Sequence, residues 1–158
     1  MKHLLALMLL GLSAAAPACP PPPPGYVAPT REEALRRDVA AAEAIVYAMV
    51  ESPIGDGELD FGTGAFSGQA GTVRVLHVYR GDLAVDQRVA LYGLSYDTSC
   101  GSLRYAPETG RRGRYGILFL HHRVEAGRPL PFTGFRPQAD VEEMIRLGLI
   151  VSGRPAGN

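Results

Sequence analysis

Two cysteines, Cys19 and Cys100, are the residues of this sequence whose side chains could do the most distinctive chemistry. A pair of thiols can form one disulfide, a thiolate can bind zinc, and an N-terminal cysteine can carry lipid. Two cysteines are too few for a disulfide-dense scaffold or for a four-cysteine zinc site. The chemistry of this pair therefore depends on the compartment of the protein and on where its mature chain begins.

Residues 1–18 have the three-part pattern of a secretory signal peptide. A short positive start is followed by an apolar run from Leu4 to Leu12, which is too short for a permanent membrane span, and then by small residues. Ala16 and Ala18 are small side chains at the two positions that a processing peptidase reads. We therefore expect cleavage after Ala18 and an exported, periplasmic or extracellular, mature chain that begins with Cys19.

A cysteine directly after the cut is also typical of a bacterial lipoprotein. Here Ala16, Pro17 and Ala18 precede Cys19, whereas a lipoprotein signal has leucine first and a small residue in the middle. Lipidation of Cys19 and anchoring in the envelope stay open as the alternative to an unmodified terminus. Lipid would occupy both the thiol and the amine of Cys19.

The mature chain divides into a proline-rich spacer over residues 19–29, a folded domain over 30–150 and a loose tail over 151–158. Five consecutive prolines predict an extended tether for the spacer. Thr30 and Glu33 fit a capping box, which predicts a helix from about Arg31 to Ala42. A closing helix is expected from about residue 139 to 147, capped near Gln138 or Asp140.

Runs of β-branched and aromatic residues predict the strands between these helices. In the segment 72–79 we expect Val73, Val75, His77 and Tyr79 to point to one face. Two prolines in the last strand place it at a sheet edge. This pattern favours a mainly β fold, a small antiparallel barrel or sandwich with two peripheral helices. The expected strands cover 45–50, 72–79, 87–94, 115–122 and 128–135, with irregular connections over 52–71 and 95–109.

The 16 basic and 16 acidic residues give a formal net charge of zero, which excludes a nucleic-acid binder that acts through bulk charge. A cluster of arginines and tyrosines could still line a nucleic-acid groove. Balanced charge and export instead favour a solvated rim with salt bridges to Glu108 and Glu125, and anionic polysaccharide or lipid headgroups stay open as partners. The cluster consists of Arg104, Arg111, Arg112, Arg114 and Arg123 with Tyr96, Tyr105 and Tyr115.

His77, His121 and His122 are the candidates for a metal site or a catalytic site. Neighbours in a strand face opposite sides, so His121 and His122 cannot converge on one ion without a bulge, although His77 could meet one of them across strands. Ser95, Ser99 and Ser102 are not part of a nucleophile elbow. We therefore expect no bound metal, no cofactor and no enzymatic activity; an enzyme would depend on His77 or His121.

Three stretches together resemble the tissue-inhibitor-of-metalloproteinase-like family, which is built on a five-stranded OB barrel. The stretches are residues 42–50, residues 73–81, and Ser99-Cys100-Gly101 followed by residues 113–120. The resemblance implies a small five-stranded antiparallel OB-like barrel. In inhibitors of this family the mature N-terminal cysteine is held by a disulfide, and its α-amine and carbonyl displace the water on the zinc of a protease. The resemblance therefore implies Cys19 as the zinc-facing residue and a zinc metalloprotease as the protein partner.

Export would place Cys19 and Cys100 in a compartment where disulfides persist. A Cys19–Cys100 bridge would close a loop of about 82 residues and stabilise the fold by roughly 4 kcal/mol in the chain-entropy model. It would also hold the spacer against the barrel, as a zinc-facing terminus requires. Lipid on Cys19 excludes both the bridge and the zinc-facing role. The alternative function is a lipid-anchored or periplasmic envelope protein that binds an unrelated partner without catalysis.

Overall fold

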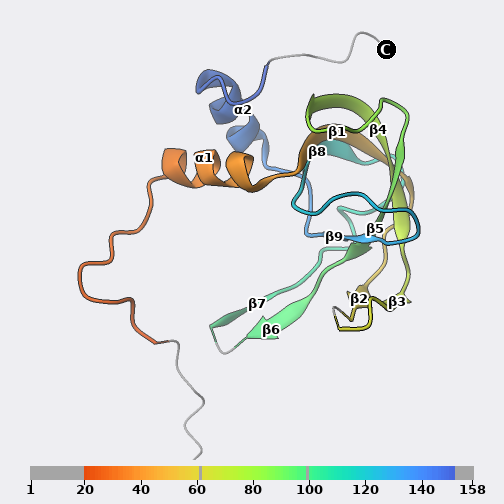
Figure 1. The fold of residues 1–158 in the computed structure, drawn as a ribbon, viewed down its shortest axis with the longest axis horizontal. Helices are drawn as coiled ribbons and strands as arrows, with labels where there is room; N and C mark the ends of the chain where they lie inside the picture. The colour runs from red at the N-terminus through yellow and green to blue at the C-terminus, as the bar shows by residue number, and fades with distance from the viewer. Residues whose placement is uncertain (1–19, 61, 99, 152–158) are drawn as a thin grey trace, which may run out of the picture.

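The computed structural model of the protein describes residues 20–60, 62–98 and 100–151 (Figure 1). The predicted signal peptide, Cys19 and all but the first residue of the predicted tail therefore lie outside the described residues. In the described part of the chain, neither helix has the length and hydropathy that a bilayer crossing requires.

A curled five-stranded sheet forms a half-barrel, with its strands in the order β8-β1-β4-β5-β9 (Figure 1). The mainly β fold with two helices is therefore confirmed. The strand β9 lies at the sheet edge, as its prolines predicted. The bounds of the five strands are β1 (Ala44–Ser52), β4 (Gly71–Arg80), β5 (Arg88–Gly93), β8 (Tyr115–Leu120) and β9 (Leu130–Phe132).

The sheet is mixed, so the expected all-antiparallel arrangement is wrong. The neighbours β8, β1, β4 and β5 pair antiparallel, but β9 pairs parallel with β5. The strand β8 runs opposite to β5, and the chain reverses where Glu125 and Arg128 form an isolated bridge. After this reversal, β9 runs in the same direction as β5. It joins the sheet beside β5, at the edge farthest from β8.

The strand β4 contains a bulge, beyond which each side chain points to the opposite face from the one that simple alternation predicts. Successive residues of β1 pair with Val75 and His77, so Leu76 is an extra residue in β4. Val75 lies in the core inside the half-barrel, together with Val46 and Leu91. Beyond the bulge, Val78 packs against this inner core, whereas Tyr79 packs against the cluster on the outer face that joins the helices to the sheet. The expectation that the segment alternates throughout is therefore wrong.

The helices α1 (Arg31–Ala41) and α2 (Gln138–Arg146) lie on the outer face of the sheet (Figure 1). The capping box of Thr30 and Glu33 is confirmed at the start of α1. The predicted side-chain cap of the second helix is wrong, because α2 begins after Pro137 without one. The outer cluster that joins helices and sheet consists of Leu35, Val39, Ala42, Ile45, Ile117, Phe119, Met144 and Ile150.

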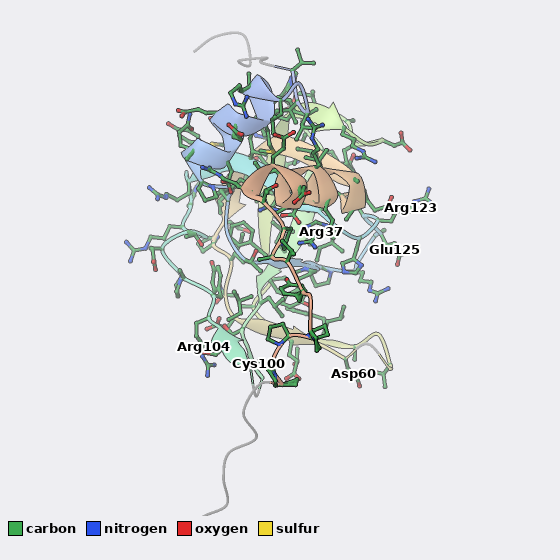
Figure 2. The ribbon with its side chains drawn as sticks, turned by 90° about the vertical axis from the view of Figure 1, so that its left-hand side faces the viewer. Arg37, Asp60, Cys100, Arg104, Arg123 and Glu125 are labelled. Atoms are coloured by element: carbon green, nitrogen blue, oxygen red, sulfur yellow. The ribbon has the colours of Figure 1, made fainter. Side chains whose placement is uncertain are left out.

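Two small hairpins occupy segments that the sequence predicted as irregular. One consists of β2 (Gly57–Leu59) and β3 (Phe66–Gly68), and the other of β6 (Tyr96–Thr98) and β7 (Gly101–Leu103). The second hairpin extends away from the half-barrel and has Cys100 in its turn (Figures 1 and 2).

Candidate functional site

Of the two predicted site residues, Cys100 is described and Cys19 is not. Cys100 is exposed in the turn between β6 and β7 (Figure 2). Because Cys19 lies outside the described residues, its roles as zinc-facing residue, disulfide partner and lipidation site all stay predictions.

The base of the β6–β7 hairpin is fixed to the half-barrel through Tyr105. The backbone amide of Tyr105 donates to Oγ of Ser95 at 2.9 Å, which joins the two ends of the hairpin. The Tyr105 hydroxyl donates to the carbonyl of Ile54 at 2.9 Å, and only 6% of the residue is exposed. Burial raises the pKa of this hydroxyl, so Tyr105 stays a neutral donor.

This anchoring role of Ser95 and Tyr105 was missed from the sequence. The sequence pattern assigns no role to Ser95 and places Tyr105 only among the tyrosines of the arginine cluster. Two glycines make room for the Tyr105 side chain: a Cβ at Gly93 would lie 2.2 Å from the ring, and one at Gly110 would lie 1.7 Å from its hydroxyl oxygen. These close approaches become visible only after the chain has folded.

The start of the described spacer and the tip of the β6–β7 hairpin lie side by side at one corner of the molecule, as both views show (Figures 1 and 2). Every residue from Pro20 to Pro29 is exposed. The amide of Tyr26 donates to the carbonyl of Pro23 at 3.0 Å, which makes a turn at Gly25. This corner therefore brings the chain that follows Cys19 close to the turn that contains Cys100.

The histidines do not converge. His77 packs edge-on against Tyr79 with ring centroids 4.7 Å apart, and the ring of His121 lies 6.3 Å from that of Phe119. No group of three or more side chains with metal-ligating atoms is found in residues 20–60, 62–98 and 100–151. The structure therefore gives the three histidines no common site.

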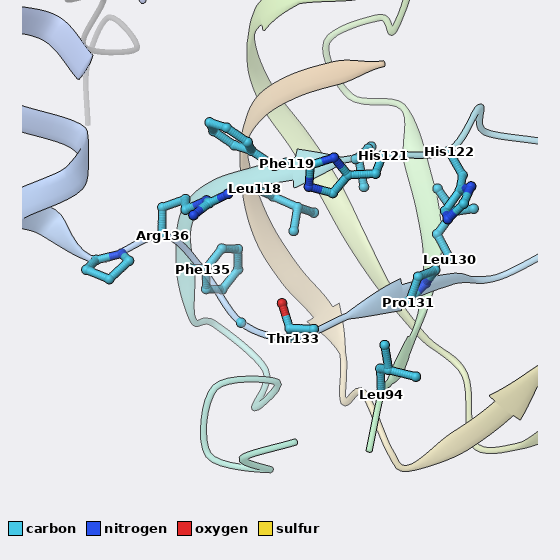
Figure 3. Close-up of a pocket in the computed structure, with 13 residues that line it drawn as sticks. Leu94, Leu118, Phe119, His121, His122, Leu130, Pro131, Thr133, Phe135 and Arg136 are labelled. Atoms are coloured by element: carbon cyan, nitrogen blue, oxygen red, sulfur yellow. The ribbon is translucent and has the colours of Figure 1, made fainter. Parts of the chain in front are cut away.

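A pocket of about 380 Å³ lies at the seam between β8 and β9, the two edges of the half-barrel (Figure 3). Leu118, Leu130 and Phe135 contribute its apolar wall, and His121 and His122 lie at its rim. The backbone amide of Arg136 donates to the carbonyl of Ile117 at 2.9 Å across this seam. The pocket therefore lies in the gap between the two edges of the half-barrel.

The side chain of Arg136 lies at one side of the seam and contacts other groups of the protein. Its guanidinium lies 4.4 Å from the centroid of the Phe119 ring and 2.7 Å from the carboxylate of Asp38 on α1. Both contacts stabilise the positive charge of Arg136 through groups of the protein itself. This arginine therefore links α1, β8 and the segment after β9.

The arginine and tyrosine groove that the sequence allowed, and that balanced charge disfavoured, is not formed as a unit. Tyr105 is buried, and Arg123 follows β8 whereas Arg111 to Arg114 precede it, so these arginines lie at opposite ends of that strand. Glu125 pairs with Arg128 at 3.6 Å, which was not among the expected ion pairs. In the described residues, the turn at 111–114 keeps its arginines beside an exposed tyrosine, Tyr115.

Comparison with known proteins identifies no relative of this chain. The chain matches no protein-family model, no curated protein and no solved structure. The resemblance to metalloproteinase inhibitors therefore stays a prediction from sequence motifs, and the function must be argued from the site itself.

Proposed function

We propose that this protein is an exported, non-catalytic binding module that inhibits a zinc metalloprotease through its N-terminal cysteine, Cys19. The observation that supports this proposal is the corner where the start of the spacer meets the β6–β7 hairpin (Figures 1 and 2). The terminus and a hairpin anchored by Tyr105 can together form one protruding surface for a protease cleft. A partly open five-stranded barrel behind them is what an OB fold supplies, and we propose that fold.

The proposed chemistry uses the first residue of the mature chain. The α-amine and the carbonyl of Cys19 would bind the protease zinc in place of the water that attacks the peptide bond. A Cys19–Cys100 disulfide would hold these atoms against the anchored hairpin. Such a bridge matters because a terminus that is already ordered loses less entropy on binding.

Intact mass of the exported protein, with and without reduction and alkylation, tests the state of the terminus. We expect a chain that starts at unmodified Cys19, is lighter than the dithiol by two hydrogen atoms, and is alkylated only after reduction. Inhibition of a panel of zinc proteases then tests the activity. A variant with one alanine added before Cys19 should lose inhibition, because the α-amine is displaced while the disulfide is kept. A chain that inhibits none of the proteases would exclude the proposal for those enzymes.

One observation favours a second candidate, an envelope protein with lipid on Cys19 and an unrelated protein partner. The described spacer is exposed over its whole length, as a tether between a membrane and a domain would be. A mass increase of diacylglycerol size on Cys19 would establish this candidate and exclude the zinc-facing role. The protein would contact a membrane only in this case.

A further inference from the structure

The two helices cover only part of the outer face of the sheet. The part around Ile45, Ile117 and Phe119 is buried under α1 and α2. The part of β8, β1 and β4 that is farther from the helices stays uncovered. This uncovered face consists of Met49, Arg74, Tyr115 and the arginine turn at residues 111–114, and the half-buried Tyr47 lies at its border, packed against the covered cluster.

A cross-strand row runs over the uncovered face. Tyr115 pairs with Met49, and Met49 pairs with Arg74 on the other side. The rings of Tyr115 and Tyr47 lie 5.9 Å apart with their planes at 57°. Tyr115 is 64% exposed, so its ring is accessible beside the charged groups. Tyrosine, methionine and arginine side by side are typical of binding surfaces rather than of a solvated rim.

The arginine turn is hydrogen-bonded to the end of β1. Gly113 donates its backbone amide to the carbonyl of Val50 at 2.9 Å, and the amide of Val50 donates to the carbonyl of Arg114 at 2.8 Å. The amide of Arg114 donates to the carbonyl of Arg111 at 3.1 Å and closes the turn. Gly113 has φ +81°, which favours glycine, so the sequence is adapted to this turn.

The charge of this turn is not neutralised within the protein. Arg111, Arg112 and Arg114 are all exposed, and no ion pair joins them to an acid in the part of the chain that the structure describes. A hollow of about 410 Å³ separates Arg112 from Arg74, with Met49 in its wall. The one carboxylate in this wall, that of Glu51, already contacts Arg74 and Arg88. The charge that complements this face is therefore negative and comes from outside the chain.

We infer that the uncovered face binds an acidic polysaccharide. The guanidinium groups of the arginine turn pair with carboxylate or sulfate groups of the chain, in the planar geometry that arginine favours. The accessible ring of Tyr115 packs against the apolar face of a sugar ring. Tyr47 and Met49 are half-buried in the sheet, so they offer little apolar surface to a bilayer. The choice of polysaccharide over single-stranded nucleic acid, which has similar requirements, rests on the expected export of the protein.

Binding to dextran sulfate and polygalacturonate, with neutral dextran as the uncharged control, tests this inference on the full mature chain by calorimetry. The double variant R111Q/R112Q should bind dextran sulfate about tenfold more weakly, as expected for two exposed ion pairs. Its matched control is R37Q/R123Q, which removes the same charge from two exposed arginines elsewhere (Figure 2). That control should change the affinity less than twofold, because neither arginine lies on the proposed face and no direct ion pair with the polysaccharide is lost.

The tyrosine contact is tested by Y115A against Y26A, because Tyr26 is 58% exposed on the spacer. Y115A should weaken binding to dextran sulfate but not to polyglutamate, which has charge without sugar rings. Thermal unfolding of each variant shows whether its fold is kept.

Three results would overturn the inference. These are equal losses in R111Q/R112Q and R37Q/R123Q, binding to polyglutamate as tight as to dextran sulfate, and a preference for oligo-dT or anionic vesicles over both polysaccharides. None of these results depends on whether the protein inhibits a protease, so the two proposals fail separately.

Discussion

Arg74 and Arg88 lie directly opposite each other on the neighbouring strands β4 and β5, and the carboxylate of Glu51 bridges them. Nε of Arg74 lies 3.1 Å from one oxygen of this carboxylate, and Nε of Arg88 lies 2.6 Å from the other. Like charges directly opposite each other destabilise a strand pair, so the acid between them stabilises the pairing, and Asp86 at 3.3 Å from Arg74 adds a second, more exposed partner.

Replacing Glu51 by glutamine should therefore destabilise the protein by about 1 kcal/mol, because the two guanidinium groups would then repel each other without a bridging charge. Added salt should reduce this loss by screening the repulsion. Urea denaturation at low and high salt measures both effects. E58Q, which removes an exposed acid on β2, is the matched control and should leave stability nearly unchanged. Equal stability of E51Q and E58Q would contradict the bridging role.

Thr30→Ala should destabilise the protein by about 1 kcal/mol through the loss of the helix cap. The hydroxyl of Thr30 accepts from the backbone amide of Glu33 at 3.2 Å, and alanine leaves this amide without a partner at the start of α1. Thr30→Asp keeps an acceptor at the cap and should retain most of the stability. Thermal unfolding monitored by circular dichroism distinguishes these variants. A Thr30→Ala protein as stable as the wild type would show that α1 does not need its cap.

The same cap predicts a dependence of stability on pH. The pKa of Glu33 is lowered, first because its carboxylate accepts from the backbone amide of Thr30 and then because it accepts from the Thr30 hydroxyl. The contribution of Glu33 is complete above the ordinary pKa of 4.5 and is lost as the pH falls through the lower folded value. The difference in stability between the wild type and Glu33→Gln should therefore shrink in this acidic range. A difference that grows toward low pH would contradict this assignment.

Tyr105→Phe should destabilise the protein by about 1–2 kcal/mol, because the carbonyl of Ile54 would lose its buried donor. It should also loosen the β6–β7 hairpin, whose base Tyr105 fixes. Hydrogen exchange of the hairpin amides, measured with global stability, separates these two effects. Tyr26→Phe, at an exposed tyrosine, is the control for loss of a hydroxyl. If hairpin exchange is unchanged in a destabilised Tyr105→Phe protein, then the Tyr105 hydroxyl supports the core without positioning Cys100, because the bond from the Tyr105 backbone amide to Ser95 is kept in this variant.

Arg136 and Asp38 should show a coupling energy of about 1 kcal/mol in a double-mutant cycle with alanine, since their ion pair is partly shielded from water. Arg136→Ala alone should destabilise the protein more than Asp38→Ala alone, because it also removes the guanidinium from the Phe119 ring. Free energies of unfolding from urea titrations give all four corners of the cycle. Additive effects of the two substitutions would show that this ion pair does not link α1 to the seam.

Cys100→Ser should lower the stability of the exported protein by roughly 4 kcal/mol if the predicted bridge to Cys19 forms. Cys19→Ser and the double variant should then match Cys100→Ser, and a reducing agent should weaken only the wild type. Unfolding midpoints with and without reductant test this. Equal wild-type midpoints in both conditions would exclude a stabilising bridge.

The local elements of this fold were decided by the sequence itself. The capping box at Thr30, the β-branched runs of β1, β4, β5 and β8, and the edge position of the proline-containing β9 all follow from neighbouring residues. Such features depend on hydrogen bonds and side-chain preferences within a few residues, so a single sequence is enough to predict them.

The relations between distant segments were decided only by the tertiary structure. The parallel pairing of β9 with β5 depends on the path that the chain takes after β8, and the bulge in β4 depends on its register with β1. The anchoring of the Cys100 hairpin needs Ser95, Tyr105 and Ile54 to meet across the fold. The bridge from Glu51 to Arg74 and Arg88 joins three strands. Contacts of this kind arise from packing between residues far apart in the chain, and the pattern of one sequence does not encode their distances.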